Sequence, residues 1–525
     1  MTDRIAGVLV PLFSLRTADD LGRGEFEGLL PMGEFALAMG HRMIQLLPID
    51  ELASGQTSPY SALSVFALDP IYISMGGLPG VDPKSCAAAR AELRCDGVPV
   101  DQVRLRARKS ELLAQAYDYF KSRAGRGLRD ECRQFTESQR DWLDDYTLFR
   151  ALRDKLGAEW ESWPAPLRTC KPAALADARL ELARPIAMLE YTQFLAHRQW
   201  RSIRQRLHGT GVLLGGDLAF SPCRESAEVW AHQELFDLDR SVGAPPDAFS
   251  KSGQRWGLPM PDWQRMRARD FDFLRRRMRH ARELFDLLRI DHVVGLFRTY
   301  GYPLGEQAGG AFDPSGEPAQ RAQGTRIMRV LHEEAGPMEI LAEDLGVIPG
   351  FVRETLAALS IPGYKVMRWE KAKRFPDSAS AAASRAEHYT DPATYPVVSL
   401  ATTGTHDTDT LIEWWASIDT DERRRFAEDL HIADRLDCGR TPLNEASLDA
   451  IIEALYASPA RFAVTPIQDL YGWDARINYP GSVSAANWTW RLPFDLEQRA
   501  EQPNNPDRTA RLHAICRRTG RFQAK

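Results

Sequence analysis

Short runs of apolar, often β-branched residues recur along the whole chain, and most of them stop at a polar residue. Continuous apolar runs bounded by turn residues are typical of strands that are buried on both faces, as in a parallel sheet. Such runs occur at residues 7–11, 43–49, 211–220, 287–294, 338–344, 363–369, 397–403 and 461–470. The pattern therefore predicts eight strands.

Amphipathic helical patterns separate many of these strands. In residues 264–288 an unbroken apolar stripe runs through Leu274, Met278, Ala281, Phe285 and Leu288, as on one face of a helix. Strands that alternate with helices predict an α/β fold, and eight is the number of strands in a (β/α)₈ TIM barrel.

The spacing of the strands predicts how the chain is divided. Residues 1–74 hold the first two barrel strands, and residues 75–210 hold only amphipathic helix patterns, which predicts a mainly helical insertion. The third strand falls in 211–224 and is followed by a second insertion, 225–263, rich in Trp, Pro and Gly. The remainder of the barrel occupies 264–525.

Composition narrows the class of protein. Of the 525 residues 44% are hydrophobic and 26% charged, which is ordinary for a soluble globular protein. The net charge of −5 gives no reason to expect nucleic acid as a partner. No apolar run is long enough for a membrane span, so we expect no membrane partner either.

The cysteines and histidines argue against disulfide and metal scaffolds. The seven cysteines are scattered and form no C-x-x-C pair, which favours a reducing compartment. The N-terminus does not resemble a signal peptide, so we expect a cytoplasmic protein. The eleven histidines are dispersed and no H-E-x-x-H motif occurs.

Four acids stand at the carboxyl ends of predicted strands, where side chains of a barrel face its active site. They are Asp217, Asp291, Glu343 and Asp407. Retaining glycosidases use two carboxylates in opposite protonation states, one as nucleophile and the other as acid and then base. Arg289 lies two residues before Asp291, on the same face of a strand, and would keep Asp291 ionised. Asp291 is therefore the predicted nucleophile and Glu343 the predicted proton donor.

The second insertion has the composition of a sugar-binding surface. Aromatic side chains can stack on pyranose rings, and the segment concentrates Trp230, Phe236, Phe249, Trp256 and Trp263. Asp247 and Gln254 are interleaved with them and could bind hydroxyl groups. The stretch 245–256 is polar and interrupted by proline, which predicts a loop that lines the site.

Specific motifs over nearly the whole chain resemble the amylomaltase, or 4-α-glucanotransferase, family. Arg289-Ile-Asp-His292 is similar to its nucleophile motif, Ala342-Glu-Asp-Leu-Gly346 to its acid/base motif, and Gly404-Thr-His-Asp407 to its stabiliser motif. Further matches are Ser58-Pro-Tyr60, Ser64-Val-Phe-Ala67, Gly216-Asp-Leu218, Val229-Trp230, Pro245-Pro-Asp247, Gly253-Gln-Arg-Trp-Gly257, Pro466-Ile-Gln-Asp-Leu470, Arg476-Ile-Asn478 and Asn487-Trp488. Ala248 and Leu258 depart from the family, which commonly has tyrosine and asparagine there.

The resemblance implies a TIM barrel with mainly helical insertions and without the C-terminal β domain of α-amylases. It implies transfer of α-1,4-glucan segments between maltooligosaccharides without a cofactor, by a monomer or weak homo-oligomer. It assigns catalysis to Asp291, Glu343 and Asp407, the last as stabiliser of the transition state. The implied substrate contacts are Ser58, Tyr60, Asp217, Asp247, Phe249, Gln254, Trp256, Arg289, His292, His406 and Asn478.

Three other functions remain open at this point. An α-glucan hydrolase would use the same carboxylates and differ only in the fate of the glycosyl-enzyme. A metal-dependent barrel enzyme would use Asp217, Asp291 and Glu343 as oxygen ligands of Mg²⁺. A non-catalytic glycan-binding barrel would need the aromatic side chains but not the set of acids.

Overall fold

The computed structural model confirms the predicted barrel. It describes residues 3–53, 55–94, 100–246, 253–305, 309–373, 387–482, 484–502 and 505–522. Eight parallel strands close in the order β1-β14-β13-β10-β9-β6-β3-β2, and each falls within or overlaps one predicted run. They are β1 (Ile5–Leu9), β2 (Met43–Gln45), β3 (Leu213–Leu218), β6 (Leu287–Ile290), β9 (Glu339–Ala342), β10 (Gly363–Val366), β13 (Ser399–Thr402) and β14 (Phe462–Pro466).

The two ends of the chain close the barrel. The first strand pairs with the last over its whole length, from Ile5 opposite Phe462 to Leu9 opposite Pro466. Strand β14 is buried at every position, and β1 at every position after the first. Burial on both faces explains why these strands appear in the sequence as continuous apolar runs.

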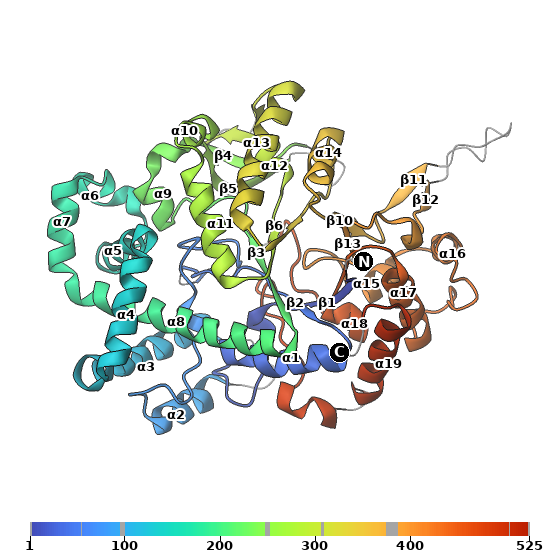
Figure 1. Ribbon diagram of the computed structural model, residues 1–525, viewed down its shortest axis with the longest axis horizontal. Helices are drawn as coiled ribbons and strands as arrows, with labels where there is room; N and C mark the ends of the chain where they lie inside the picture. The colour runs from blue at the N-terminus through green and yellow to red at the C-terminus, as the bar shows by residue number, and fades with distance from the viewer. Residues whose placement is uncertain are drawn as a thin grey trace.

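Helices surround the barrel (Figure 1). Those that contact barrel strands include α1 (Leu29–Ala38), α8 (Ala183–Thr210), α11 (Asp272–Leu284), α13 (Glu317–Ala335), α17 (Glu445–Ala457) and α18 (Ile467–Tyr471). The others after β3 are α9 (Ala227–Ala231), α10 (Trp263–Ala268), α12 (Val294–Phe297), α14 (Gly350–Ala358), α15 (Leu411–Ser417), α16 (Thr420–Asp429) and α19 (Asn505–Arg518).

A helical layer lies between β2 and β3 in sequence and on the left of Figure 1. Its helices are α2 (Pro83–Leu93), α3 (Gln102–Arg123), α4 (Arg126–Ser138), α5 (Arg140–Leu156), α6 (Ala165–Arg168), α7 (Pro172–Glu181) and then α8. The side chains of Asp82 and Asp101 accept N–H groups of the first turns of α2 and α3, so the sequence itself fixes where these helices begin. Among the described residues of 75–210 there is no strand.

A second sheet, which the sequence did not predict, stands beside the barrel. Its antiparallel order is β5-β4-β7-β8, with β4 (Phe236–Ala244), β5 (Gln254–Pro261), β7 (Thr299–Pro303) and β8 (Ala311–Asp313). The first two strands follow β3 and the other two follow β6, so this sheet joins the insertions of neighbouring barrel strands. A two-stranded sheet of β11 (Lys371–Lys373) and β12 (Glu387–Tyr389) follows β10.

The single helix predicted over 264–288 is wrong in extent. The chain forms α10 and α11 instead, separated at Asp270 and Phe271, whose φ angles of 51° and 54° are incompatible with a continuous right-handed helix. Helix α11 ends at Leu284, and Leu288 belongs to β6. The apolar stripe continued past the helix because a buried helix face and a buried strand are both apolar.

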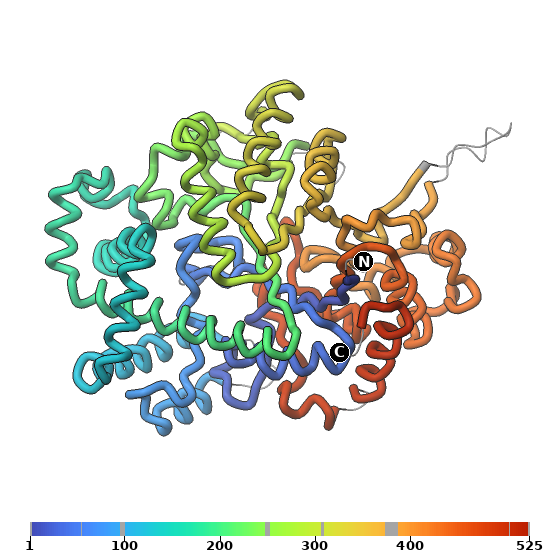
Figure 2. Tube along the Cα trace, in the orientation of Figure 1, coloured from blue at the N-terminus to red at the C-terminus, as the bar shows by residue number. Residues whose placement is uncertain are grey.

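After β14 the regular elements of the described residues are all helices, and no β domain follows the barrel there. The marks for the two ends of the chain lie in the same part of Figure 2, and the Arg521 guanidinium near the C-terminus donates to the backbone carbonyl of Ile5. No described helix is both long and apolar enough to span a bilayer.

Candidate active site

An arginine joins two of the strand-end acids. Arg289 Nη1 lies 2.7 Å from both carboxylate oxygens of Asp217, and Nη2 lies 2.9 Å from Asp291 Oδ1. Strands β3 and β6 are neighbours, and Asp217 is opposite Arg289 in their register. A Cβ atom on Gly216 would lie 2.4 Å from the Phe285 ring, so a side chain there would displace the strand that carries Asp217. Asp217 is buried, whereas the Asp291 side chain is 26% exposed and accessible to a substrate.

Tyr60 connects Asp217 and its partner Arg289 to the turn after β13. Its hydroxyl donates to Asp217 Oδ2 at 2.8 Å and lies 3.0 Å from His406 Nε2, and its ring stacks on the His406 ring. Ser58, which the sequence also placed in the site, accepts the Tyr60 backbone N–H at 3.4 Å and therefore stabilises the turn rather than pairing with an acid.

Glu343 is held against the turn that follows Asp291. Its Oε2 accepts the His292 backbone N–H at 2.8 Å and its Oε1 accepts the Leu345 N–H at 3.1 Å. His292 has a φ of 46°, a strained conformation for a residue with a side chain, which occurs here directly beside the predicted nucleophile. Burial raises the pKa of Glu343 to about 8, and the Asp291 charge adds to the increase while Arg289 opposes it. A carboxyl group in this environment holds its proton at neutral pH.

Asp407 has the opposite electrostatic environment. Its Oδ1 accepts the Asn478 side-chain amide at 2.6 Å, and its Oδ2 lies 3.1 Å from His406 Nε2. Although burial opposes ionisation, the charge and hydrogen bond of His406 and the Asn478 amide lower the pKa of Asp407 to about 2. The side chain is 45% exposed, so it presents a permanent negative charge at the surface of the site.

The structure places Gln254 and Trp256 on strand β5 rather than in the predicted loop. The Trp256 ring meets the His292 ring edge to face, with centroids 4.8 Å apart, and its Nε1 donates to Gln254 Oε1. This contact brings the second sheet against the turn after Asp291. Asp247 and Phe249, the other two predicted contacts from this segment, lie outside the described residues.

Three of the aromatic residues proposed as sugar platforms are core residues. Trp230, Phe236 and Trp263 are at most 5% exposed. Trp230 packs against Phe149 and Trp163, and Trp263 Nε1 donates to the buried hydroxyl of Thr299. The prediction was wrong for these three because aromatic side chains stabilise cores and sugar sites alike.

Two residues of the site were missed from the sequence. Trp488 packs its ring against both Tyr60 and His406, with centroids 6.0 and 5.8 Å apart. Tyr364 is buried on β10, and burial raises its pKa while the charges of Arg289, Asp217, Glu343 and Asp291 all act on its phenol. Its position on a barrel strand was visible in the sequence, but a tyrosine between Gly363 and Lys365 gives no sign that it faces acids.

Comparison with known proteins identifies the family. The family model described as 4-alpha-glucanotransferase matches residues 10–497. The chain belongs to the 4-α-glucanotransferase family. It is 34% identical to the 4-alpha-glucanotransferase of Thermus thermophilus over 93% of both chains, and 30% identical to that of Chlamydia pneumoniae over 94% of this chain and 92% of the relative.

Solved structures agree with this 4-α-glucanotransferase assignment. The amylomaltase of Streptococcus agalactiae, solved in complex with acarbose, superposes with a TM-score of 0.82 at 26% identity and covers 99% of this chain and 100% of its own. The amylomaltase of Corynebacterium glutamicum shares the fold, with a TM-score of 0.78 at 20% identity over 98% of this chain and 75% of its own.

The geometry of this glucanotransferase does not favour the magnesium alternative. Two of the three acids that would serve as ligands already pair with Arg289, whose guanidinium occupies the position of a cation between Asp217 and Asp291. Among the residues that the structure describes, no three His, Cys, Asp or Glu side chains are grouped so that they could hold a metal ion.

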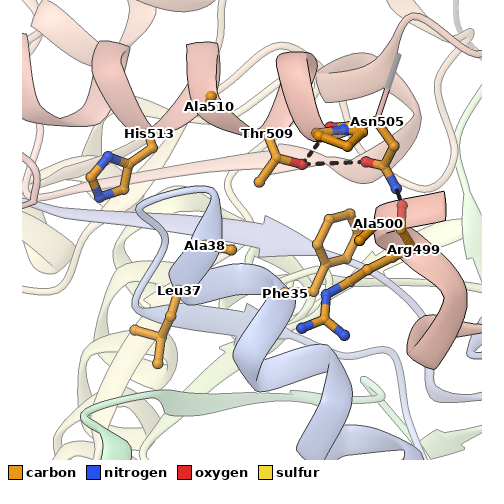
Figure 3. Close-up of a pocket in the computed structure, with 10 residues that line it drawn as sticks. Phe35, Leu37, Ala38, Arg499, Ala500, Asn505, Thr509, Ala510 and His513 are labelled. Carbon is orange, nitrogen blue, oxygen red and sulfur yellow. Dashed lines mark hydrogen bonds between the residues drawn. The ribbon is translucent and has the colours of Figure 1, made fainter. Parts of the chain in front are cut away.

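A pocket of about 440 Å³ lies elsewhere, between α1 and α19 (Figure 3). Its polar side chains bond to one another or to backbone: Asn505 Nδ2 donates to the Arg499 carbonyl, and Thr509 Oγ1 lies 3.2 Å from Asn505 Oδ1. None of the described residues that line it is acidic. This pocket is therefore separate from the group of strand-end acids.

Proposed function

We propose that this enzyme transfers α-1,4-glucan segments between maltooligosaccharides by a retaining double displacement. The observation that carries the proposal is the contrast between two acids on neighbouring strands. Asp291 is paired with Arg289 at 2.9 Å, whereas Glu343 is half-buried and loss of solvation raises its pKa to about 8. One ionised and one protonated carboxyl group are what the two steps of the reaction require.

In the first step Glu343 donates its proton to the glycosidic oxygen while Asp291 attacks the anomeric carbon. The bond to the leaving chain breaks, and that chain departs with a free 4-hydroxyl group. In the second step the Glu343 carboxylate takes the proton from the 4-hydroxyl of an acceptor, whose oxygen attacks the anomeric carbon and releases Asp291. Two inversions restore the α configuration.

The other residues bind and orient the sugar in this proposal. The ionised Asp407 faces the positive charge that develops on the ring in the transition state, which a fixed negative charge stabilises. Asn478 and His406 both contact Asp407, and His406, Tyr60, Asp217 and Arg289 continue this set of polar contacts. His292, Gln254 and Trp256 are the proposed contacts where the second sheet meets the turn after Asp291. Asp247 and Phe249 are proposed as further contacts.

Transfer outruns hydrolysis in this proposal, and hydrolysis is the alternative to test. A sugar acceptor competes with water only if binding supplies proximity and orientation, which can contribute about 7–11 kcal/mol. Pure maltotriose should therefore be converted into glucose and a ladder of longer maltooligosaccharides, with little net gain of reducing ends. If reducing ends rise in step with substrate loss and no product exceeds three glucose units, the enzyme is a hydrolase.

We also propose that the enzyme works in the cytoplasm, on maltodextrins derived from starch or glycogen. Six described cysteines, Cys86, Cys132, Cys170, Cys223, Cys438 and Cys516, are free, in keeping with a reducing compartment. Fractionation of cells that express the native protein would test the location.

A further inference from the structure

A buried arginine donates hydrogen bonds to both ends of the turn that carries His406 and Asp407. Arg368 is 5% exposed and lies just beyond the end of β10. Its Nε donates to the Thr403 carbonyl at 2.8 Å, and its Nη1 donates to the Asp409 carbonyl at 2.8 Å. These two carbonyl groups flank His406 and Asp407, so one guanidinium fixes both ends of the segment between them.

A buried carboxylate on the other neighbouring strand's side also bonds to this turn. Asp469, in α18 beyond the end of β14, is 1% exposed. Its Oδ2 accepts the Thr403 hydroxyl at 2.5 Å, and its Oδ1 accepts the Leu411 backbone N–H at 2.7 Å. The hydrogen bonds of Asp469 therefore reach the first residues of the turn and the start of α15.

The two side chains form one unit. Arg368 Nη2 lies 3.7 Å from Asp469 Oδ2. In the barrel β13 stands between β10 and β14, so the turn after β13 is held by opposite charges from both neighbouring strands. Buried charges are costly unless they are paired, and a turn needed only for folding can be held by apolar contacts. All the hydrogen bonds of this pair nevertheless go to the segment around Asp407.

We propose that Arg368 and Asp469 are positioning residues that set the location of the Asp407 carboxylate for the reaction. The inference rests on the role proposed above for Asp407. The charge that Asp407 stabilises develops only in the transition state, so displacing it should lower kcat with little effect on KM. A displacement of about 1 Å can cost about 100-fold in rate.

The test is the double variant Arg368→Gln/Asp469→Asn, which removes both charges together and leaves polar groups that can still form hydrogen bonds. We expect kcat for disproportionation of maltotriose to fall by about 10- to 100-fold, with KM within about twofold of wild type. Should the double variant fold poorly, Arg368→Lys keeps the charge but cannot bond both carbonyls, and we expect an intermediate loss of kcat.

A mutant cycle separates positioning from general destabilisation. If the pair acts through Asp407, the double substitution should cause little further loss in an Asp407→Asn background. The control is Lys109→Met/Glu25→Gln, which removes a buried ion pair of 2.7 Å between α3 and the segment before α1 and should lower Tm without changing kcat.

Each outcome bears on a different claim. Wild-type kcat in a folded double variant, or equal losses with and without Asp407, would overturn the positioning role. High activity in Asp407→Asn alone would overturn the proposed function of Asp407 instead, so the two failures are distinguishable.

Discussion

Raising the pH through the pKa of Glu343 should stop the first chemical step, because only the protonated carboxyl can donate to the glycosidic oxygen. Burial raises this pKa from an ordinary 4.5 to about 8. At pH 7 about nine molecules in ten then carry the proton, against roughly one in 300 for a carboxyl that titrates at 4.5. The structure thus assigns a gain of about 300-fold in the protonated form to the surroundings of this one side chain.

The assay is kcat/KM for maltotriose between roughly pH 6 and pH 10, which reports the pKa values of the free enzyme. We expect a plateau and then a fall of about tenfold per pH unit above about pH 8. Asp407, whose pKa is about 2, stays ionised throughout and adds no limb in this range. A fall of about tenfold per pH unit already under way at pH 6, or no fall up to pH 10, would refute the assignment of Glu343 as the acid.

The same shift predicts a change in stability. Because the folded state holds the Glu343 proton more tightly than the unfolded state, stability falls as pH rises from about 4.5 to about 8. Asp50 and Glu228, whose pKa values burial raises to about 7, contribute with the same sign. The informative comparison is therefore between the Tm of wild type and the Tm of Glu343→Gln across this pH range. The Tm of the variant should depend less on pH than the Tm of wild type. Identical slopes would contradict the buried environment described for this carboxyl.

Five other substitutions, at four positions, test the site and its surroundings. Asp291→Asn should lose several orders of magnitude in rate while staying folded, and azide with an activated α-glucosyl donor should rescue Asp291→Gly and yield β-glucosyl azide. Tyr60→Phe removes the hydroxyl that bonds Asp217 and His406 and should lower kcat/KM about tenfold, as expected for one lost hydrogen bond of about 1.5 kcal/mol to a charged group; unchanged kcat/KM would show that the contact is dispensable. Trp230→Ala should cost about 3–5 kcal/mol of unfolding free energy with an unchanged product ladder. Phe249→Ala should instead shift products towards hydrolysis with little change in Tm. The reverse pattern would mark Phe249 as a core residue and Trp230 as a residue of the site.

The barrel could be predicted because its strands are buried on both faces and therefore leave continuous apolar runs. The second sheet could not, because its longest strands mix polar and apolar residues without a regular alternation. Strand β4 reads Phe-Asp-Leu-Asp-Arg-Ser-Val-Gly-Ala, and its burial is irregular. The helix predicted over 264–288 was too long because periodicity does not show where the backbone leaves the right-handed helical conformation, as it does at Asp270 and Phe271.

The acids of the site could be grouped from the sequence because the carboxyl ends of barrel strands meet on one face. Their hydrogen bonds could not be predicted. Tyr60 and Asp217 are 157 positions apart, and only the folded chain shows that one hydroxyl reaches both Asp217 and His406. Burial was the other missing quantity, since Trp230 and Trp256 are the same residue type in one segment, and only Trp230 is a core residue.

The pairing of β1 with β14 has a consequence for synthesis of the chain. Ile5 cannot meet Phe462 until the chain up to Phe462 has left the ribosome, and at about 5–20 residues per second the wait is roughly 25 to 90 s. During that interval the first strand lacks one neighbour and the strand-end acids have no closed scaffold. The nascent enzyme is therefore inactive until its last strand arrives, and exposed strand edges during translation make chaperone binding most useful before that point.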